Sequence, residues 1–190
     1  MRIGCNTLYG GGELGSTADF TPDELRRSLE RNSALGYETV EFSHLCHLTL
    51  DEVTEIGAYT RRLGMAPWSV HAESASGFLL GRSPQEAAQS LVHAVQICQV
   101  VGAQVVVVHA PVLLGLTLGE LPDVGALLAA DLAVLRPGFD RARKCHVRLA
   151  LENGGSLAHW VYILSLVERM AEPLLGVCVD TGHANLGDLL

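Results

Sequence analysis

The sequence is poor in aromatic residues, which make up 5% of its 190 residues against a hydrophobic share of 48%. A core must therefore be built from Val, Leu, Ala and Ile, and residues 1–190 are enough for one domain. The five cysteines are scattered, odd in number and include no CxxC pair, which favours reduced thiols. No apolar run is long enough to span a membrane, and no apolar signal region follows Met1. We therefore expect a cytoplasmic protein with no membrane partner.

Basic residues are also scarce, because 13 Lys and Arg face 21 Asp and Glu for a formal charge of -8. No overall field attracts nucleic acid, so we expect no nucleic-acid partner, although a local basic strip is compatible with an acidic protein.

Short runs rich in β-branched residues alternate with segments of helix length. The expected strands are 2–6, 38–43, 67–71, 104–109, 147–152 and 175–180. Three of the helices between them start with a capping box, in which a hydroxyl and a Glu three residues later bind free backbone amides. These boxes start at Thr21, Thr49 and Ser83, and the corresponding helices are followed by Gly36, Gly64 and Gly102, where a left-handed residue is favoured. Pro137-Gly138 is expected to kink the fourth helix or end it early.

Six consecutive strand–helix units predict an α/β fold with a parallel sheet. Their length suits a (β/α) TIM barrel, of which about six of the eight units are present. An open doubly wound sheet is the alternative, but it usually has a Gly-rich phosphate turn after its first strand. The stretch YGGGELG at 9–15 lacks the G-x-G-x-x-G spacing, so we interpret it as a loop over the barrel mouth.

Ionisable residues end the expected strands on the face opposite the bulky apolar side chains. In the third strand, for example, His71 faces away from Trp68 and Val70. The apolar face must meet the helices, so the other face lines the barrel interior. The residues expected inside, near the carboxyl ends of the strands, are Glu41, His71, His109, Glu152 and Asp180, with His183 in the loop above Asp180.

Several ionisable groups at one rim are costly to bury unless something pairs them, and Arg148 is expected to lie below that rim. A divalent cation is the economical partner. Ligation led by carboxylates suits Mn²⁺, Mg²⁺ or Co²⁺, whereas a site that draws on the histidines favours Zn²⁺.

Five motifs together resemble the xylose isomerase-like TIM barrels, a superfamily of sugar isomerases and epimerases, inosose-processing enzymes and nucleases of the endonuclease IV type. They are GYETVEFS (36–43), SVHAES (69–74), GAQVVVVHAP (102–111), VRLALENGG (147–155) and GVCVDTGHANL (176–186). The resemblance implies that Glu152 and Asp180 bind one divalent metal, that Glu152 also carries a proton as the catalytic acid/base, and that His183 assists substrate or metal.

The same resemblance implies that His71 and His109 bind substrate in one branch and further zinc ions in the nuclease branch. We also expect Asn6 and Glu41 to bind substrate. The family completes its metal site with a His from strand seven and a Glu from strand eight, and no counterpart of either is found in these 190 residues. The sequence is then part of a longer chain, or is closed by another chain such as a second copy, or has lost catalysis.

The leading prediction is a metal-dependent isomerase or epimerase of a sugar, sugar phosphate or related polyol. A proton is abstracted next to a metal-polarised carbonyl. The first alternative is a zinc-dependent endonuclease, but the basic clusters at 61–62 and 141–144 fall in expected helices away from the mouth. The second is a truncated barrel without catalytic function, which acts as a binding or assembly module.

Overall fold

A computed structural model describes residues 3–7, 20–72, 83–109 and 124–186. Strands and helices alternate along these residues. They are β1 (Gly4–Asn6), α1 (Pro22–Ala34), β2 (Thr39–Phe42), α2 (Leu50–Arg62), β3 (Ala66–His71), α3 (Pro84–Val101), β4 (Val105–His109), α4 (Val124–Cys145), β5 (Arg148–Glu152), α5 (Leu157–Met170), β6 (Leu175–Cys178) and α6 (Thr181–Leu186). The loop expected at 9–15 lies outside the described residues.

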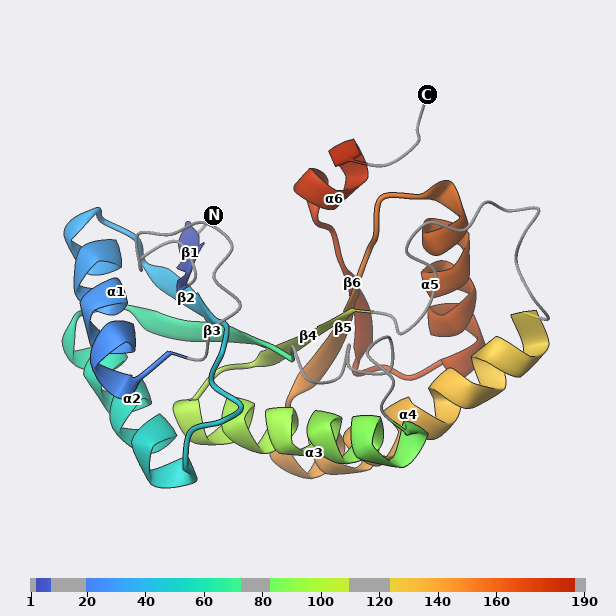
Figure 1. Cartoon of the computed structure of the whole chain (residues 1–190), viewed down its shortest axis with the longest axis horizontal. Helices are drawn as coiled ribbons and strands as arrows, with labels where there is room; N and C mark the ends of the chain where they lie inside the picture. The colour runs from blue at the N-terminus through green and yellow to red at the C-terminus, as the bar shows by residue number, and fades with distance from the viewer. Residues whose placement is uncertain (1–2, 8–19, 73–82, 110–123, 187–190) are drawn as a thin grey trace.

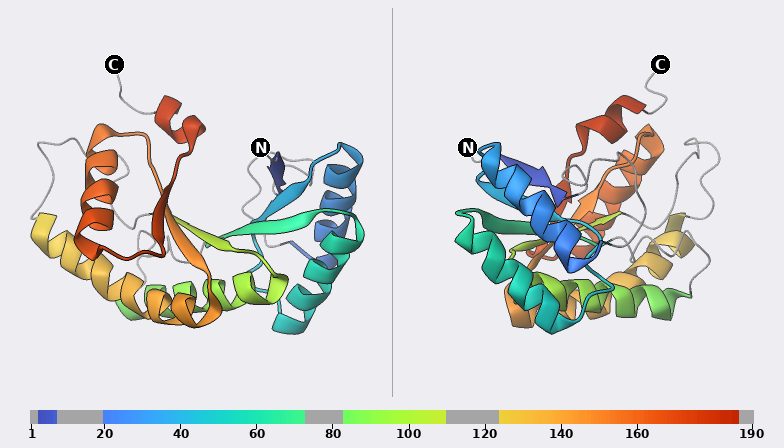
Figure 2. Two further views of the ribbon diagram at one scale, coloured as in Figure 1. Left: turned by 180° about the vertical axis from the view of Figure 1, so that it is seen from behind. Right: turned by 60° about the vertical axis from the view of Figure 1, so that its left-hand side comes forward.

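The six strands form one sheet in the order β1-β2-β3-β4-β5-β6, and every neighbouring pair is parallel. The sheet is curved, with β1 and β6 at its two ends and α1 to α5 along its outer side (Figures 1 and 2). Within the described residues, β1 and β6 do not pair with each other. The arrangement confirms a partial TIM barrel and excludes a doubly wound sheet, which has helices on both faces.

The helix ends follow the sequence signals. Thr21, Thr49 and Ser83 each accept the amide of a Glu three residues later, whose side chain returns to the cap, so the three capping boxes are confirmed. Gly36, Gly64 and Gly102 have φ of 85°, 80° and 86°, a conformation that costs a residue with a Cβ considerably more. These local signals fix where each helix starts and stops between consecutive strands.

The hydrophobic core lies between the outer face of the sheet and the helices. Strand residues on that face are at most 2% exposed, namely Val40, Phe42, Val70, Val106, Val108, Leu149 and Leu151. Helix residues of the same core are Leu25, Leu29, Val53, Ile56, Leu91 and Ile97. The alternation inferred from the sequence is therefore confirmed for most strands, and it leaves the ionisable strand ends on the inner face.

The fourth helix does not end early, because α4 continues through Pro137 to Cys145. A Cβ at Gly138 would lie 2.5 Å from Cδ2 of Leu91 in α3, so the glycine lets the two helices approach closely. This packing holds the helix across a residue that cannot donate its own hydrogen bond. The expectation of an early stop was wrong for this reason.

Trp68 lies on the other face of its strand from the one predicted. Val40 pairs with Pro67, but Glu41 pairs with Ser69, so Trp68 is an extra residue in β3. This irregularity interrupts the alternation and places Trp68 beside Glu41 and Ser69 in grooves on the inner face, where it is 45% exposed.

A search of the described helices finds none that is both long and apolar enough to cross a membrane.

Candidate active site

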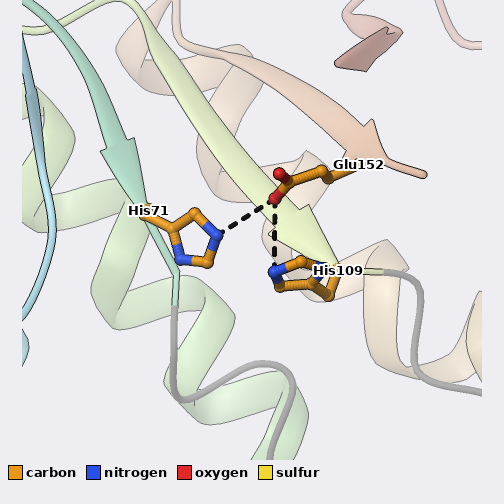
Figure 3. A group of neighbouring side chains, drawn as sticks. All are labelled: His71, His109 and Glu152. Atoms are coloured by element: carbon orange, nitrogen blue, oxygen red, sulfur yellow. Dashed lines mark hydrogen bonds and ion pairs between the residues drawn. The ribbon is translucent and has the colours of Figure 1, made fainter. Parts of the chain in front are cut away.

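A buried carboxylate at the end of β5 is the centre of the site. Glu152 is 6% exposed and stands in register between His109 of β4 and Cys178 of β6. Its Oε2 lies 3.1 Å from Nε2 of His71 and 3.2 Å from Nε2 of His109, and both imidazoles point toward it (Figure 3). The carboxyl ends of three consecutive strands thus place three of the predicted residues in direct contact.

The turn after β6 supplies the second part of the site. The strand ends at Cys178 rather than at 180, and Asp180 precedes the first turn of α6. Asp180 Oδ1 accepts the amide of His183 at 2.7 Å, as an N-cap residue does. His183 therefore lies in a helix rather than in the predicted loop, and its Nδ1 is 3.7 Å from Oε1 of Glu152. The D-x-x-H spacing has a structural reason, because it is the spacing of a cap and the third residue of its helix.

Mutual interactions set the protonation of these groups. Burial lowers the pKa of His109, the neighbouring imidazoles lower it further, and the Glu152 carboxylate opposes them without reversing the shift. Burial alone would raise the pKa of Asp180, but the His183 amide, a hydrogen bond with Glu152 and the charge of His183 together hold it below its ordinary value. Near neutral pH the site thus combines a neutral His109 with an ionised Asp180.

Two overlapping groups of side chains have the composition and spacing of a cation site. One group is His71, His109 and Glu152, the other is Glu152, Asp180 and His183, and within each the ligand atoms lie within 4.8 Å of one another. Glu152 and Asp180 bring two carboxyl groups into the second of these groups, and a cation between them would offset their mutual repulsion. The residues present therefore fit a divalent ion, with carboxylate and imidazole ligands as its donors.

Asn6 and Glu41 lie in a separate network on the inner face. The described contacts of Glu41 are a hydrogen bond from Nδ2 of Asn6 at 2.7 Å and one from Oγ of Ser69 at 2.7 Å, rather than contacts to Glu152. This network is still close to the end of β6, because Glu41, Ser69 and Cys178 line the same groove. Burial raises the pKa of Cys178 to about 11, and the charges of Glu152, Glu41 and Asp180 add to the effect. Substrate binding by Asn6 and Glu41 stays a prediction.

Two residues that the sequence did not single out hold the turn after β5. Asn153 is fully buried and bonds to the backbone of Asp180, and Nδ1 of His159 in α5 accepts the amide of Gly154. His159 is 3% exposed, and its charge also bears on His109. A polar residue directly after Glu152 was the available signal for Asn153, because a buried amide must find partners. No local signal distinguishes His159 from a surface histidine of a helix.

A family model for the xylose isomerase-like TIM barrel matches residues 29–189. The chain belongs to this family. No curated protein is similar enough in sequence to match it. In this family the strand ends of β3 to β6, which carry the Glu152 cluster, form part of the barrel rim where enzymes of this fold place their chemistry.

Solved structures of sugar epimerases share the fold of this chain at low sequence identity. A D-psicose 3-epimerase from Clostridium cellulolyticum H10, solved with D-tagatose, superposes with a TM-score of 0.74 at 13% identity, over 100% of this chain and 67% of its own. A 3-keto-D-glucoside 4-epimerase from E. coli gives 0.73 at 14%, over 100% and 72%. An L-ribulose 3-epimerase gives 0.70 at 16%, over 99% and 63%. This chain thus spans roughly two thirds of the length of these proteins.

Proposed function

We propose that this chain carries the proton-transfer half of a metal-dependent sugar epimerase or isomerase that acts on a ketose or keto-sugar. One observation carries the proposal: a buried carboxylate, Glu152, meets three histidines and a second carboxylate at the ends of four consecutive strands. Each of the three epimerases is named for a carbonyl sugar or was solved with one, which supports that substrate class.

Glu152 is the group proposed to take a proton from the carbon next to the substrate carbonyl. Its burial and its position between imidazoles suit a base that must lose its water shell before it reacts. Glu152, Asp180 and His183 would hold the divalent cation, which when bound polarises the carbonyl oxygen. His183 is proposed to assist proton transfer, and His71 and His109 are proposed to orient the hydroxyl groups of the sugar. Mn²⁺, Co²⁺, Mg²⁺ and Zn²⁺ all accept this mixed donor set.

The test is solvent exchange at the reacting carbon. The chain is incubated in D₂O with D-psicose, D-tagatose, L-ribulose or 3-keto-glucoside, with each of the four ions or with EDTA. We expect deuterium at the carbon next to the carbonyl, together with the epimer, in a reaction that EDTA suppresses. Absence of exchange with all four sugars and all four ions would overturn the proposal for this chain.

A zinc-dependent nuclease is the second candidate, and the His71–His109–Glu152 group is the observation that favours it. Its weakness is the position of the basic residues. Arg61 and Arg62 end α2 just before β3, and Arg143 and Lys144 end α4 just before β5, so both groups lie at the amino ends of the strands, opposite Glu152. Cleavage of DNA with an abasic site in the presence of Zn²⁺ would decide for this candidate.

A further inference from the structure

We propose that Asn153 is the positioning residue of the site: it fixes Asp180 and His183 relative to Glu152 and sets which nitrogen of His183 carries the proton. Asn153 follows Glu152 directly and is fully buried, so its side chain cannot exchange partners with water. The inference rests on the proposed function for what the site does, but the contacts that carry it are independent of the substrate.

The side chain of Asn153 pairs with the backbone of Asp180 in both directions. Its Oδ1 accepts the Asp180 amide at 2.7 Å, and its Nδ2 donates to the Asp180 carbonyl at 2.9 Å. The backbone amide of Asn153 adds a bond to the carbonyl of Cys178 at 3.4 Å. The amide side chain thus continues the pairing of β5 with β6 beyond the last strand residue, at the point where the chain turns into α6.

This pairing determines where Asp180 and His183, the two metal-binding candidates after β6, lie. Asp180 is held through its own backbone, and its Oδ1 then caps the amide of His183. Asn153 also contacts His183 directly, because its backbone carbonyl lies 2.9 Å from Nδ1 of that imidazole. One buried residue therefore links Glu152, its chain neighbour, to the two side chains that share a candidate cation with it.

The contact with the carbonyl selects one tautomer of His183. A carbonyl oxygen only accepts hydrogen bonds, so Nδ1 carries the proton, and Nε2 keeps the lone pair that can bind a cation or accept a proton. Partners of this kind orient metal-binding histidines, and their loss typically weakens metal affinity by about 10–100-fold. Substitution of Asn153 should then affect the site while the barrel itself remains folded.

The first measurement is the tautomer of His183 in the unchanged, metal-free chain. A long-range ¹H–¹⁵N spectrum of histidine-labelled protein is recorded above the histidine titration range, and the His183 signals are assigned by their loss in His183→Gln. We expect Nδ1 to carry the proton. A predominant Nε2-protonated form would overturn the proposal without any variant of Asn153.

The second measurement compares variants by calorimetric titration with Mn²⁺. Asn153→Ala removes both side-chain bonds to Asp180, and Asn153→Asp keeps the size and the acceptor but loses the Nδ2 donor. Asn32→Ala is the matched control. Asn32 is a buried asparagine, 2% exposed, and it lies in α1, which connects β1 and β2, whereas Glu152 is in β5. We expect an affinity loss of about 10–100-fold in both Asn153 variants and less than about twofold in the control.

The two failures can be told apart. Unchanged Mn²⁺ affinity and an unchanged His183 tautomer in folded Asn153→Ala would overturn the positioning role. If Asn153→Ala does not fold, the same criterion applies to Asn153→Asp. If the unchanged chain binds no Mn²⁺ and exchanges no sugar proton, the proposed function fails, and the tautomer of His183 alone decides the role of Asn153.

Discussion

Two buried carboxyl groups lie in contrasting surroundings. Glu152 is 6% exposed at a strand end, among three imidazoles and a second carboxylate. Asp131 is fully buried in α4, where its described partner is the hydroxyl of Tyr162 in α5 and its Oδ1 has no hydrogen-bond partner among the described residues. Burial raises the pKa of Asp131 to about 6, although the bond from Tyr162 opposes the shift.

The comparison shows that a perturbed carboxyl group does not by itself identify a functional site. Asp131 has a strongly shifted pKa but lies between two packed helices, and its partner among the described residues is the Tyr162 hydroxyl rather than an imidazole or a second carboxyl group. Glu152 is distinguished by its neighbours, which offer further donors and acceptors at the end of a sheet. Substitutions at the two positions should therefore change different properties.

The largest effect is expected for Glu152→Gln. The amide keeps the size of the side chain but cannot take a proton, so the rate of solvent exchange into a reactive sugar should fall by about 10²–10⁴-fold. The measurement is deuterium incorporation, with circular dichroism to show that the fold is kept. Asp131→Asn is the matched control, because it makes the same chemical change at a buried carboxyl remote from substrate. A comparable loss of exchange in both variants would erase the distinction.

Asp131→Asn should instead change stability, in a manner that depends on pH. Because the pKa of Asp131 is raised to about 6 from its ordinary 3.8, protonation favours the folded state. The cost of ionising this group is absent below the unfolded pKa, grows as pH rises toward 6, and reaches about 3 kcal/mol above it. We expect the variant to be more stable than the unchanged chain by up to that amount at pH 7.5 and by little near pH 4. Urea unfolding at both pH values measures this, and equal differences at both would contradict it.

Tyr162→Phe isolates the single hydrogen bond of Asp131. Without the hydroxyl, the carboxyl loses its described partner, so we expect a destabilisation of about 1–3 kcal/mol. The pKa of Asp131 should also rise further, because the bond from Tyr162 is what lowers it. Urea unfolding gives the first quantity, and the pH dependence of stability gives the second. In the Asp131→Asn background the added pH dependence should disappear.

Glu55→Gln provides the baseline of an exposed carboxylate and should have the smallest effect. Oε2 of Glu55 lies 3.3 Å from Nη2 of Arg26, and 71% of the Glu55 side chain is exposed, so solvent screens the pair. We expect a change in unfolding free energy within about 0.5 kcal/mol and no change in sugar exchange. A larger change would show that surface charge, rather than burial, governs the carboxyl groups of this chain.

Much of the fold and the centre of the site follow from patterns that are local in sequence. The capping boxes and the glycines after the helices set the element ends, and the alternation of apolar residues placed His71, His109 and Glu152 on one face. These features depend on neighbours within a few residues or on the two-residue repeat of a strand. The folded protein keeps these features because burial of the apolar strand face in the core stabilises the same arrangement that the local pattern favours.

The errors arose where a distant segment decides the local conformation. The extra residue at Trp68 is visible only in the register of β3 against β2, and the passage of α4 through Pro137 depends on close packing at Gly138. The roles of Asn153 and His159 depend on partners 27 residues and five residues away, in a turn whose course the sequence does not reveal. Single-strand alternation contains no information about such pairings.

The irregularity in β3 also gives the protein an optical reporter. Trp68 and Trp160 are its two tryptophans, and Trp160 packs against the core from α5. Trp68 stands on the inner face with 45% of its surface open to water, next to Glu41 and Ser69. Any molecule or polypeptide that covers this face removes water from one indole and not from the other. The wavelength of tryptophan emission and its quenching by iodide therefore report when the inner face is covered, independently of any catalytic assay.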